Sequence, residues 1–319
     1  MKPASYIKLY KSGELKKRIN CLFKKLESCN LCPRNCQVNR LKGQKGLCRT
    51  AMDVRVFNYM AHLGEEPPVS GKNGSGAIFF SGCPLRCVYC QNYRFSQLLQ
   101  GRTVKADSLA RFMLKLQEQG CHNINLVSPT HVLYQILEAL QLAIEGGLTI
   151  PLVYNTSGYE SRETLELLNE IVDVYLADMR YGDNEKAARY SGVSDYVEIN
   201  RIALKEMYRQ VGNVELDDSQ IIERGLIIRH LVMPNDVSNT ENVLSFIAKE
   251  ISKDAFISLM SQYLPCYRAK EFSQLNRKIT SGEYEKAKNL LNGFGLYNGW
   301  FQEDYGKESL AGINIEPNA

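Results

Sequence analysis

Residues 77–91 of this 319-residue chain read AIFFSGCPLRCVYCQ, and they place three cysteines directly after a short apolar run. The run Ala77–Phe80 has the length and composition of a buried strand. Cys83, Cys87 and Cys90 follow it with the spacing C-x3-C-x2-C. No fourth cysteine belongs to the same stretch. The sequence therefore predicts a strand whose carboxyl end leads into a metal-binding loop.

Short apolar runs alternate with helical patterns after residue 76, which is typical of a parallel α/β sheet. Strands are expected at Ala77–Phe80, Ile124–Val127, Leu152–Asn155, Val174–Ala177, Leu226–Val232 and Phe256–Met260. The intervening helices are expected to be capped by Asp107, by Thr130 and by an Asp195–Glu198 capping box, and to stop at Gly120, Gly146 and Gly212. Six strand–helix units are too few for an eight-fold barrel, so the pattern predicts a curved open sheet or a partial (βα)6 barrel that binds ligands at its strand carboxyl ends.

Three regions follow from these patterns. They are a Cys-rich N-terminal segment at 1–75, the partial barrel at 76–265, and a C-terminal extension at 266–319 with a helix at Glu283–Asn292. The turn-rich stretch GEEPPVSGKNGSG, residues 64–76, predicts a linker or surface loop. The tail GFGLYNGWFQED carries the single tryptophan, Trp300, and predicts packing residues.

Composition narrows the class of protein. Hydrophobic residues at 44% and charged residues at 23% are ordinary for a globular protein. The net charge of +4 is mild and the basic residues are scattered, which makes nucleic acid an unlikely partner. The N-terminus has no apolar core, and no later run approaches the about 18 residues of a membrane span, so a cytoplasmic protein without a membrane partner is expected. Ten cysteines in such a protein, eight of them between residues 21 and 90, favour metal ligation over disulfides.

The cysteine triplet itself indicates a type of metal centre. Thiolates are the usual ligands of iron–sulfur clusters, and a cluster of four irons normally takes four of them. Three thiolates leave one iron open, where a substrate or cofactor can bind directly. The alternative is a zinc site completed by a distant ligand, although a single C-x3-C-x2-C loop is not the paired knuckle common in zinc sites.

The motif C-x3-C-x-φ-C after the first strand of a partial barrel, with Tyr89 as the aromatic φ, resembles the radical S-adenosylmethionine enzymes. The resemblance covers residues 76 to 265 and is strongest toward the pyruvate formate-lyase activating enzymes and an uncharacterised branch of their relatives. The shared stretches are CNLCPRNCQVNR, HNINLVSPTH, DVYLADMRY, RHLVMPN and LMSQYLP. The resemblance implies a 4Fe-4S cluster on Cys83, Cys87 and Cys90 whose open iron chelates S-adenosylmethionine. It also implies reduction by a flavodoxin or ferredoxin and cleavage to methionine and a 5′-deoxyadenosyl radical that abstracts hydrogen from a substrate.

The same resemblance suggests residues that contact the cofactor. Relatives end their second strand in Gly-Gly-Glu, whereas Ser128-Pro129-Thr130 stands here, so the methionyl amine is expected to meet carbonyls or the two hydroxyls, since Pro129 has no amide donor. Arg180 takes the place of a lysine and is expected to pair with the methionyl carboxylate. The candidate cofactor-binding residues are Tyr89, Ser128, Thr130, Asn155, Ser157, Asp178, Arg180 and Arg229. Without the resemblance, Asp178 is as readily a turn-capping residue and Arg229 a solvated edge charge.

The substrate is open at this stage. The first hypothesis is hydrogen abstraction from a protein or peptide partner, as in the activating enzymes; modification of a small molecule or of RNA is an alternative within enzymes. A non-catalytic iron–sulfur or zinc scaffold is an alternative of another class.

A second cysteine group, Cys29, Cys32, Cys36 and Cys48, has the spacing C-x2-C-x3-C-x11-C. Four thiolates close a coordination shell, which predicts a structural zinc ion or an auxiliary iron–sulfur cluster. The alternative is four reduced cysteines without a metal. The remaining cysteines, Cys21, Cys121 and Cys266, are expected to be small buried apolar side chains. His131 is expected at the surface, at the start of a helix.

Overall fold

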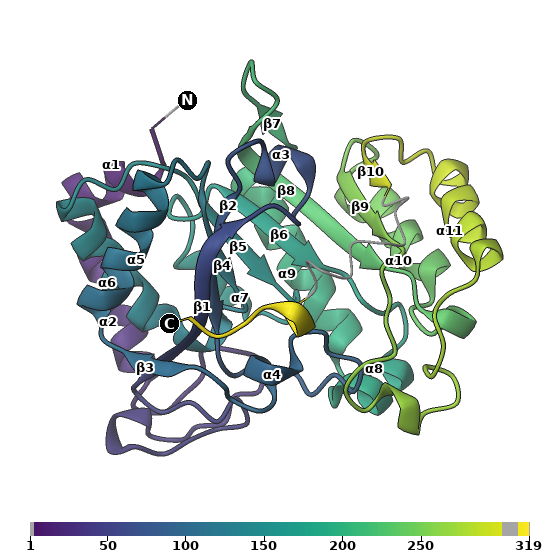
Figure 1. The fold of residues 1–319 in the computed structure, drawn as a ribbon, viewed down its shortest axis with the longest axis horizontal. Coiled ribbons are helices and arrows are strands. Elements are labelled where there is room, and N and C mark those ends of the chain that lie inside the picture. The colour runs from purple at the N-terminus through teal and green to yellow at the C-terminus, as the bar shows by residue number, and fades with distance from the viewer. Residues whose placement is uncertain (1–2, 302–311, 319) are drawn as a thin grey trace.

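A computed structural model describes residues 3–301 and 312–318, and it is built around one curved sheet (Figure 1). The strand order is β10-β9-β8-β6-β5-β4-β2-β1-β3, with β7 paired to β8 alone. The strands are β1 (Val54–His62), β2 (Ser75–Phe80), β3 (Arg102–Val104), β4 (Ile124–Val127), β5 (Leu152–Thr156), β6 (Val174–Asp178), β7 (Glu215–Leu216), β8 (Ile222–Leu231), β9 (Phe256–Met260) and β10 (Gly299–Phe301).

The six predicted strands are confirmed, and they are neighbours in the sheet. Strands β2, β4, β5, β6, β8 and β9 pair in parallel in that order. All residues of β2 and β4 are buried. Parallel strands with helices on their connections are covered on both faces, which is why they read as continuous apolar runs.

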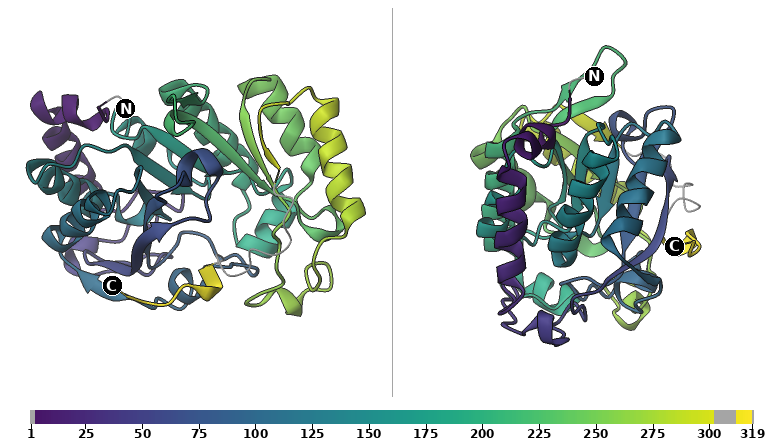
Figure 2. Two further views of the ribbon diagram at one scale, coloured as in Figure 1. Left: turned by 45° about the horizontal axis from the view of Figure 1, so that its top comes forward. Right: turned by 90° about the vertical axis from the view of Figure 1, so that its left-hand side faces the viewer.

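Helices pack along the outside of this sheet. They are α1 (Tyr6–Lys11), α2 (Glu14–Lys25), α3 (Pro67–Ser70), α4 (Tyr93–Ser96), α5 (Ala106–Glu118), α6 (Leu133–Glu145), α7 (Arg162–Glu166), α8 (Asn184–Ser191), α9 (Tyr196–Val211), α10 (Thr240–Phe246) and α11 (Ser281–Gly293). In α5 the side chains of Leu109, Phe112, Met113 and Leu116 share one buried face, as their spacing predicts. Figures 1 and 2 show α5 and α6 at one end of the sheet with α1 and α2 against α6, and α10 and α11 at the other end.

The predicted helix starts are only partly right. Asp107 lies in the first turn of α5, after the N-cap residue Lys105. Thr130 begins a short 3-10 turn, Thr130–Val132, that precedes α6. Asp195 is the N-cap of α9, but its carboxylate accepts a hydrogen bond from the Tyr159 hydroxyl at 2.8 Å instead of capping the helix.

The N-terminal segment is more regular than the sequence predicted. It contributes α1, α2 and β1, and β1 pairs antiparallel with β2 and with β3. The stretch 64–76 is not a surface linker, because Glu66 and Val69 are buried and its last residues belong to β2. The expected boundary at residue 75 therefore cuts through the sheet.

The C-terminal extension also joins the sheet, because β10 pairs in parallel with β9. Trp300 lies in this strand and is 44% exposed, so its side chain is only partly packed. Residues 302–304 of the predicted tail lie outside the described residues. Residues 312–318, in yellow in Figure 1, pass in front of β1, and Asn318 N–H donates to the Phe57 carbonyl.

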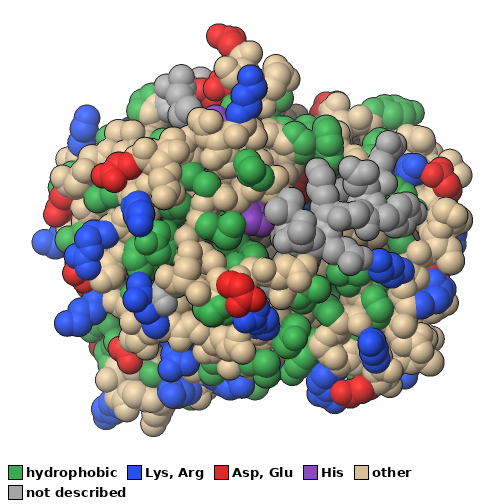
Figure 3. Space-filling model, viewed as in Figure 1, with side chains coloured by type: hydrophobic (Ala, Val, Ile, Leu, Met, Phe, Trp, Pro, Cys, Tyr) green, Lys and Arg blue, Asp and Glu red, His purple; other side chains and the backbone are tan. Residues whose placement is uncertain are grey.

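Neither a membrane-spanning helix among the described residues nor, on the face drawn in Figure 3, a basic stripe is present. None of the described helices is long and apolar enough to cross a membrane. Figure 3 shows lysine and arginine side chains scattered across the face turned to the viewer, between acidic and apolar ones.

Candidate active site

The cysteine loop leaves the carboxyl end of β2 and is fixed by backbone hydrogen bonds. Ser81 N–H donates to the Arg55 carbonyl on β1, and Gly82 N–H donates to the Phe95 carbonyl on α4. Gly82 has φ +97°, a conformation that glycine adopts without strain. The sheet thus positions Cys83, Cys87 and Cys90 at the end where a parallel α/β fold binds ligands.

Each of the three sulfur atoms has a hydrogen-bond partner from the protein. Cys87 Sγ accepts from the Ser191 hydroxyl at 3.0 Å and from Arg180 Nη1 at 3.2 Å. Cys83 Sγ accepts from the Leu85 backbone N–H at 3.4 Å, and Cys90 Sγ lies 3.2 Å from the Ser96 hydroxyl. Donors around sulfur stabilise thiolates and tune the potential of an iron–sulfur cluster.

Burial disfavours free thiolates in this loop. Burial, together with the neighbouring Cys87, raises the pKa of Cys83 to about 11 and that of Cys90 to about 12. Without a metal these thiols are protonated at neutral pH, and a bound metal is what converts them to thiolates. The described residues contain no group of three or more ligands placed to hold a single metal ion. A cluster binds each thiolate through a different iron, so three separate thiolates still fit an iron–sulfur cluster.

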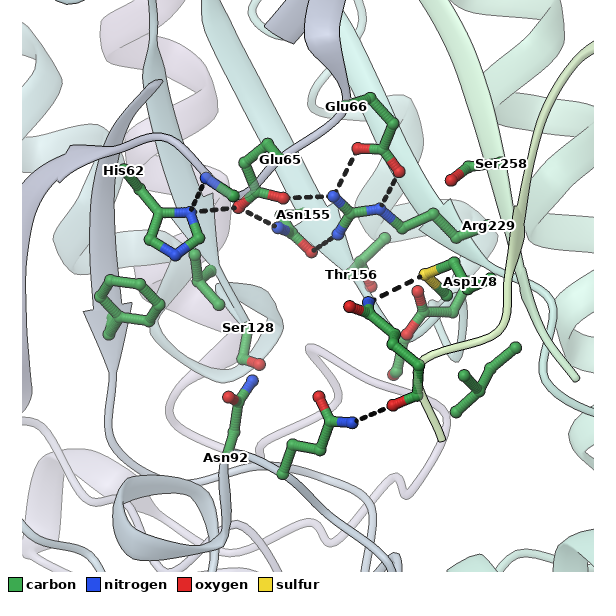
Figure 4. Close-up of a pocket in the computed structure, with 18 of the residues that line it drawn as sticks. His62, Glu65, Glu66, Asn92, Ser128, Asn155, Thr156, Asp178, Arg229 and Ser258 are labelled. Atoms are coloured by element: carbon green, nitrogen blue, oxygen red, sulfur yellow. Dashed lines mark hydrogen bonds and ion pairs between the residues drawn. The ribbon is translucent and has the colours of Figure 1, made fainter. Parts of the chain in front are cut away.

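A large cavity opens beside the loop, with about 1520 Å³ of empty space including its mouth. The predicted residues that line it are Tyr89, Cys90, Ser128, Asn155, Ser157, Asp178, Arg180 and Arg229. They come from the carboxyl ends of successive parallel strands, and Figure 4 shows several of them around the cavity.

Thr130 is the predicted cofactor residue that the structure places elsewhere. It does not line the cavity, and its hydroxyl donates to Glu160 at 2.5 Å. Tyr154 and Thr156 also donate to Glu160, which is fully buried. Burial raises the pKa of the Glu160 carboxyl to about 7. Thr130 therefore belongs to an interior polar cluster behind β5, because the 3-10 turn directs its side chain away from the cavity.

Arg180 donates hydrogen bonds both to the Asp178 carboxylate and to the Cys87 sulfur. Its Nε and Nη2 donate to Asp178 Oδ2 at 3.0 and 2.5 Å, while Nη1 reaches Cys87 Sγ. Burial alone would lower the pKa of Arg180, but the charge of Asp178, together with those of Cys87, Tyr89 and Tyr196 when ionised, outweighs burial and raises it. The guanidinium is therefore a fixed positive charge next to the cysteine loop.

Arg229 is held by two glutamates that sequence reasoning missed. Its Nε and Nη2 donate to both Glu66 oxygens at 2.8 and 2.6 Å, Nη2 also donates to Glu65, and Nη1 donates to Asn155 Oδ1 at 3.4 Å (Figure 4). The side chains of Arg229, Glu65 and Glu66 are 12%, 8% and 5% exposed. Arg229 is thus not a solvated edge charge, because its guanidinium lines the cavity and is paired with two buried carboxylates.

The strap that carries these glutamates, residues 62–67, forms one wall of the cavity. His62 Nδ1 lies 3.7 Å from Glu65 Oε1, and Asn125 Nδ2 donates to the same oxygen at 2.8 Å. Burial opposes the charge on Glu65, yet Arg229 and His62 keep its pKa below the ordinary value. Trp300 of β10 and Ile315 of the C-terminal segment contribute to the lining as well.

The second cysteine group is also gathered by the fold. Cys29, Cys32, Cys36 and Cys48 line one small cavity together with Arg40 and His131. His131 is 1% exposed, so the expectation of a surface histidine is wrong. Among the other cysteines Cys121 is buried, whereas Cys266 is half-buried and Cys21 is exposed, which contradicts the expectation for Cys21.

The fold and this site define a class of protein. It is a parallel α/β partial barrel with a three-cysteine loop at the carboxyl end of its first parallel strand, beside a cavity lined by polar and apolar side chains. Residues 77–213 match the Radical SAM superfamily. The chain belongs to the radical S-adenosylmethionine superfamily.

The chain is also similar to individual proteins. The chain is 34% identical over 280 residues to the uncharacterized protein MJ0674 of Methanocaldococcus jannaschii, covering 85% of this chain and 76% of that protein. It is 24% identical over 234 residues to the pyruvate formate-lyase-activating enzyme of Clostridium pasteurianum, covering 70% and 90%. Among solved structures, native anSMEcpe with bound AdoMet matches with a TM-score of 0.45 and 16% identity over 69% of this chain and 61% of that chain.

Proposed function

We propose that the protein is a radical S-adenosylmethionine enzyme that abstracts hydrogen from a protein or peptide partner. The observation that supports the proposal is the loop of Cys83, Cys87 and Cys90 after β2, from which Cys90 lines the cavity formed by the other strand ends. When bound, a reduced 4Fe-4S cluster supplies the electron that cleaves S-adenosylmethionine.

The charges around the cavity suit a cationic cofactor. Glu65, Glu66 and Asp178 supply three negative charges, and Arg180 and Arg229 supply two positive ones. S-adenosylmethionine carries an ammonium, a sulfonium and a carboxylate, so its net charge of about +1 complements this excess of one negative charge.

The residues of this chain have distinct tasks in the proposal. Arg180 holds Asp178 and Cys87 in one hydrogen-bonded unit, which fixes a carboxylate beside the cysteine loop. Tyr89 lines the cavity next to Cys90 and donates to the Tyr181 hydroxyl at 2.7 Å, which fixes its ring. Ser128, Asn155 and Ser157 present polar groups from two strand ends for the methionyl and ribose parts.

The similarity to an activating enzyme favours a protein or peptide as the hydrogen donor. The cavity opens to solvent, as access for a protein segment requires. By the same analogy, the electron donor is a flavodoxin or a ferredoxin.

The basic test uses the anaerobically reconstituted protein, dithionite and S-adenosylmethionine, with chromatography for 5′-deoxyadenosine. The parental protein and a control with exposed Cys21→Ser should form it, and Cys87→Ala should not. A metal scaffold without catalytic function would form none.

The substrate class is tested with extract from cells grown in deuterated medium, separated by size. Deuterium should appear in 5′-deoxyadenosine with the macromolecular fraction, and protease treatment of that fraction should abolish the transfer. Transfer from the small-molecule fraction, or loss after ribonuclease treatment, would favour the alternative substrates.

A further inference from the structure

The small cavity lined by the second cysteine group is built by a folded loop of the N-terminal segment. Cys29 N–H donates to the Val38 carbonyl at 3.0 Å, and Gln37 N–H donates to the Cys29 carbonyl at 3.0 Å. These bonds close the chain between the first and third cysteines. The loop thus brings Cys29, Cys32 and Cys36 to the same cavity as Cys48, although they lie in a region without apolar periodicity.

His131 lines the same cavity and comes from another part of the fold. Its Nε2 lies 2.8 Å from the Ser81 carbonyl oxygen. Because a carbonyl oxygen only accepts, Nε2 carries the proton, and the lone pair is on Nδ1. Nδ1 is buried and has no hydrogen-bond partner in the described residues. A histidine whose other nitrogen donates to a backbone carbonyl is the usual arrangement of a metal ligand.

Arg40 is a buried positive charge beside the cysteines of this cavity. It is 1% exposed and donates to the Ala51 and His131 carbonyls, with Nη1 also 4.0 Å from Cys29 Sγ. No ion pair between Arg40 and a carboxylate is present among the described residues. A guanidinium is always charged, and an uncompensated buried charge is strongly destabilising. Thiolates bound to a metal would provide the missing negative charge.

We propose that this cavity binds one zinc ion, with His131 Nδ1 and thiolates of the second cysteine group as ligands. Zinc takes four sulfur or nitrogen donors in structural sites, including three cysteines with one histidine. The side chains must move toward the ion on binding, because they do not yet form a ligand group for one ion.

The proposed site also supports the catalytic loop. The Ser81 carbonyl that fixes His131 lies two residues before Cys83. A Cβ atom at Gly82 would lie 2.8 Å from the Cys48 carbonyl oxygen and 2.9 Å from His131 Nε2, so the two cysteine loops are in close contact. Zinc would therefore join the N-terminal segment to the end of β2.

The test is zinc analysis of the full-length protein after equilibration with zinc and removal of the excess, with iron measured in parallel. The informative variant is His131→Gln, because a glutamine amide can still donate to the Ser81 carbonyl but lacks Nδ1. The loss of one ligand should weaken zinc binding at least tenfold, and Cys29→Ser with Cys48→Ser should abolish it. Exposed Cys21→Ser is the matched cysteine control and should keep the parental zinc content.

A readout independent of catalysis comes from cobalt substitution. Cobalt bound in the parental protein should show tetrahedral ligand-field bands with thiolate charge transfer, and the His131→Gln protein should lose or shift the ligand-field bands. About one zinc per chain in the parental protein, lost as described, supports the proposal. No zinc, zinc unaffected by His131→Gln, or about four extra irons in place of zinc would overturn it.

Discussion

Replacing Arg229 by Met tests the buried ion-pair cluster at the cavity. The substitution keeps a long apolar side chain but leaves Glu65 and Glu66 buried without their cation. Both carboxylate side chains are less than a tenth exposed. Removing one partner of a buried ion pair typically costs about 3–5 kcal/mol, so Arg229→Met should lower the free energy of unfolding by that amount near pH 7.5.

The pH dependence of the unfolding free energy distinguishes the loss of the buried ion pair from a loss of packing. In the parental protein the pKa of Glu65 is lowered, so its contribution to stability is present above the pKa of the unfolded chain and is lost as the pH falls through the lower folded value. In Arg229→Met, burial without the cation raises the pKa of the Glu65 carboxyl. The variant should therefore regain stability as the pH falls from 7.5 toward 5, and its difference from the parental protein should shrink.

The assay is urea unfolding followed by circular dichroism at several pH values. The matched control is Arg268→Met, which breaks the exposed pair with Glu271, where both side chains are 54% exposed. Such surface pairs contribute about 0–1 kcal/mol. Equal losses for the two variants, or a loss for Arg229→Met that does not change with pH, would refute the reasoning.

Two further predictions concern charges near the site. Burial raises the pKa of Glu160 to about 7 from an ordinary 4.5, so the parental stability should fall as the pH rises between those values. Glu160→Gln should lack this fall, and the difference in unfolding free energy between the two proteins should change by about 3 kcal/mol from pH 4 to pH 8. Parallel curves of stability against pH would contradict the raised pKa. Arg180→Met removes a cation and an N–H donor from Cys87 Sγ, so a redox titration of the reconstituted cluster should give a more negative potential than in the parental protein. The potential of Arg180→Lys should lie between the two, and an unchanged potential in Arg180→Met would count against the contact between Arg180 and Cys87.

The strands of the sheet were predictable where burial on both faces leaves a continuous apolar run. Strand β1 was not, because its register shifts between Val56 and Asn58 and the shift breaks the alternation of buried and exposed residues. Strand β10 has three residues and begins at Gly299, which approaches the Ile257 backbone with φ +143°. Such a strand forms through its parallel neighbour and leaves almost no local signal.

In the candidate site, too, some residues were predictable from the sequence and others were not. Residues at strand ends, such as Asn155 and Asp178, could be placed because the carboxyl ends of parallel strands meet. Glu65 and Glu66 could not, since a GEEPP stretch reads as a turn, and their partner Arg229 lies more than 160 residues away. Thr130 was misplaced because the 3-10 turn after β4 changes the direction of its side chain.

The most direct test of the central claim is formation of 5′-deoxyadenosine by the reconstituted protein. With dithionite and S-adenosylmethionine, the parental protein should produce it, and Cys83→Ala, Cys87→Ala and Cys90→Ala should each reduce the yield to the level of a reaction without protein. A parental protein that carries four irons yet forms no 5′-deoxyadenosine, or a Cys87→Ala protein that forms it at the parental rate, would contradict the account.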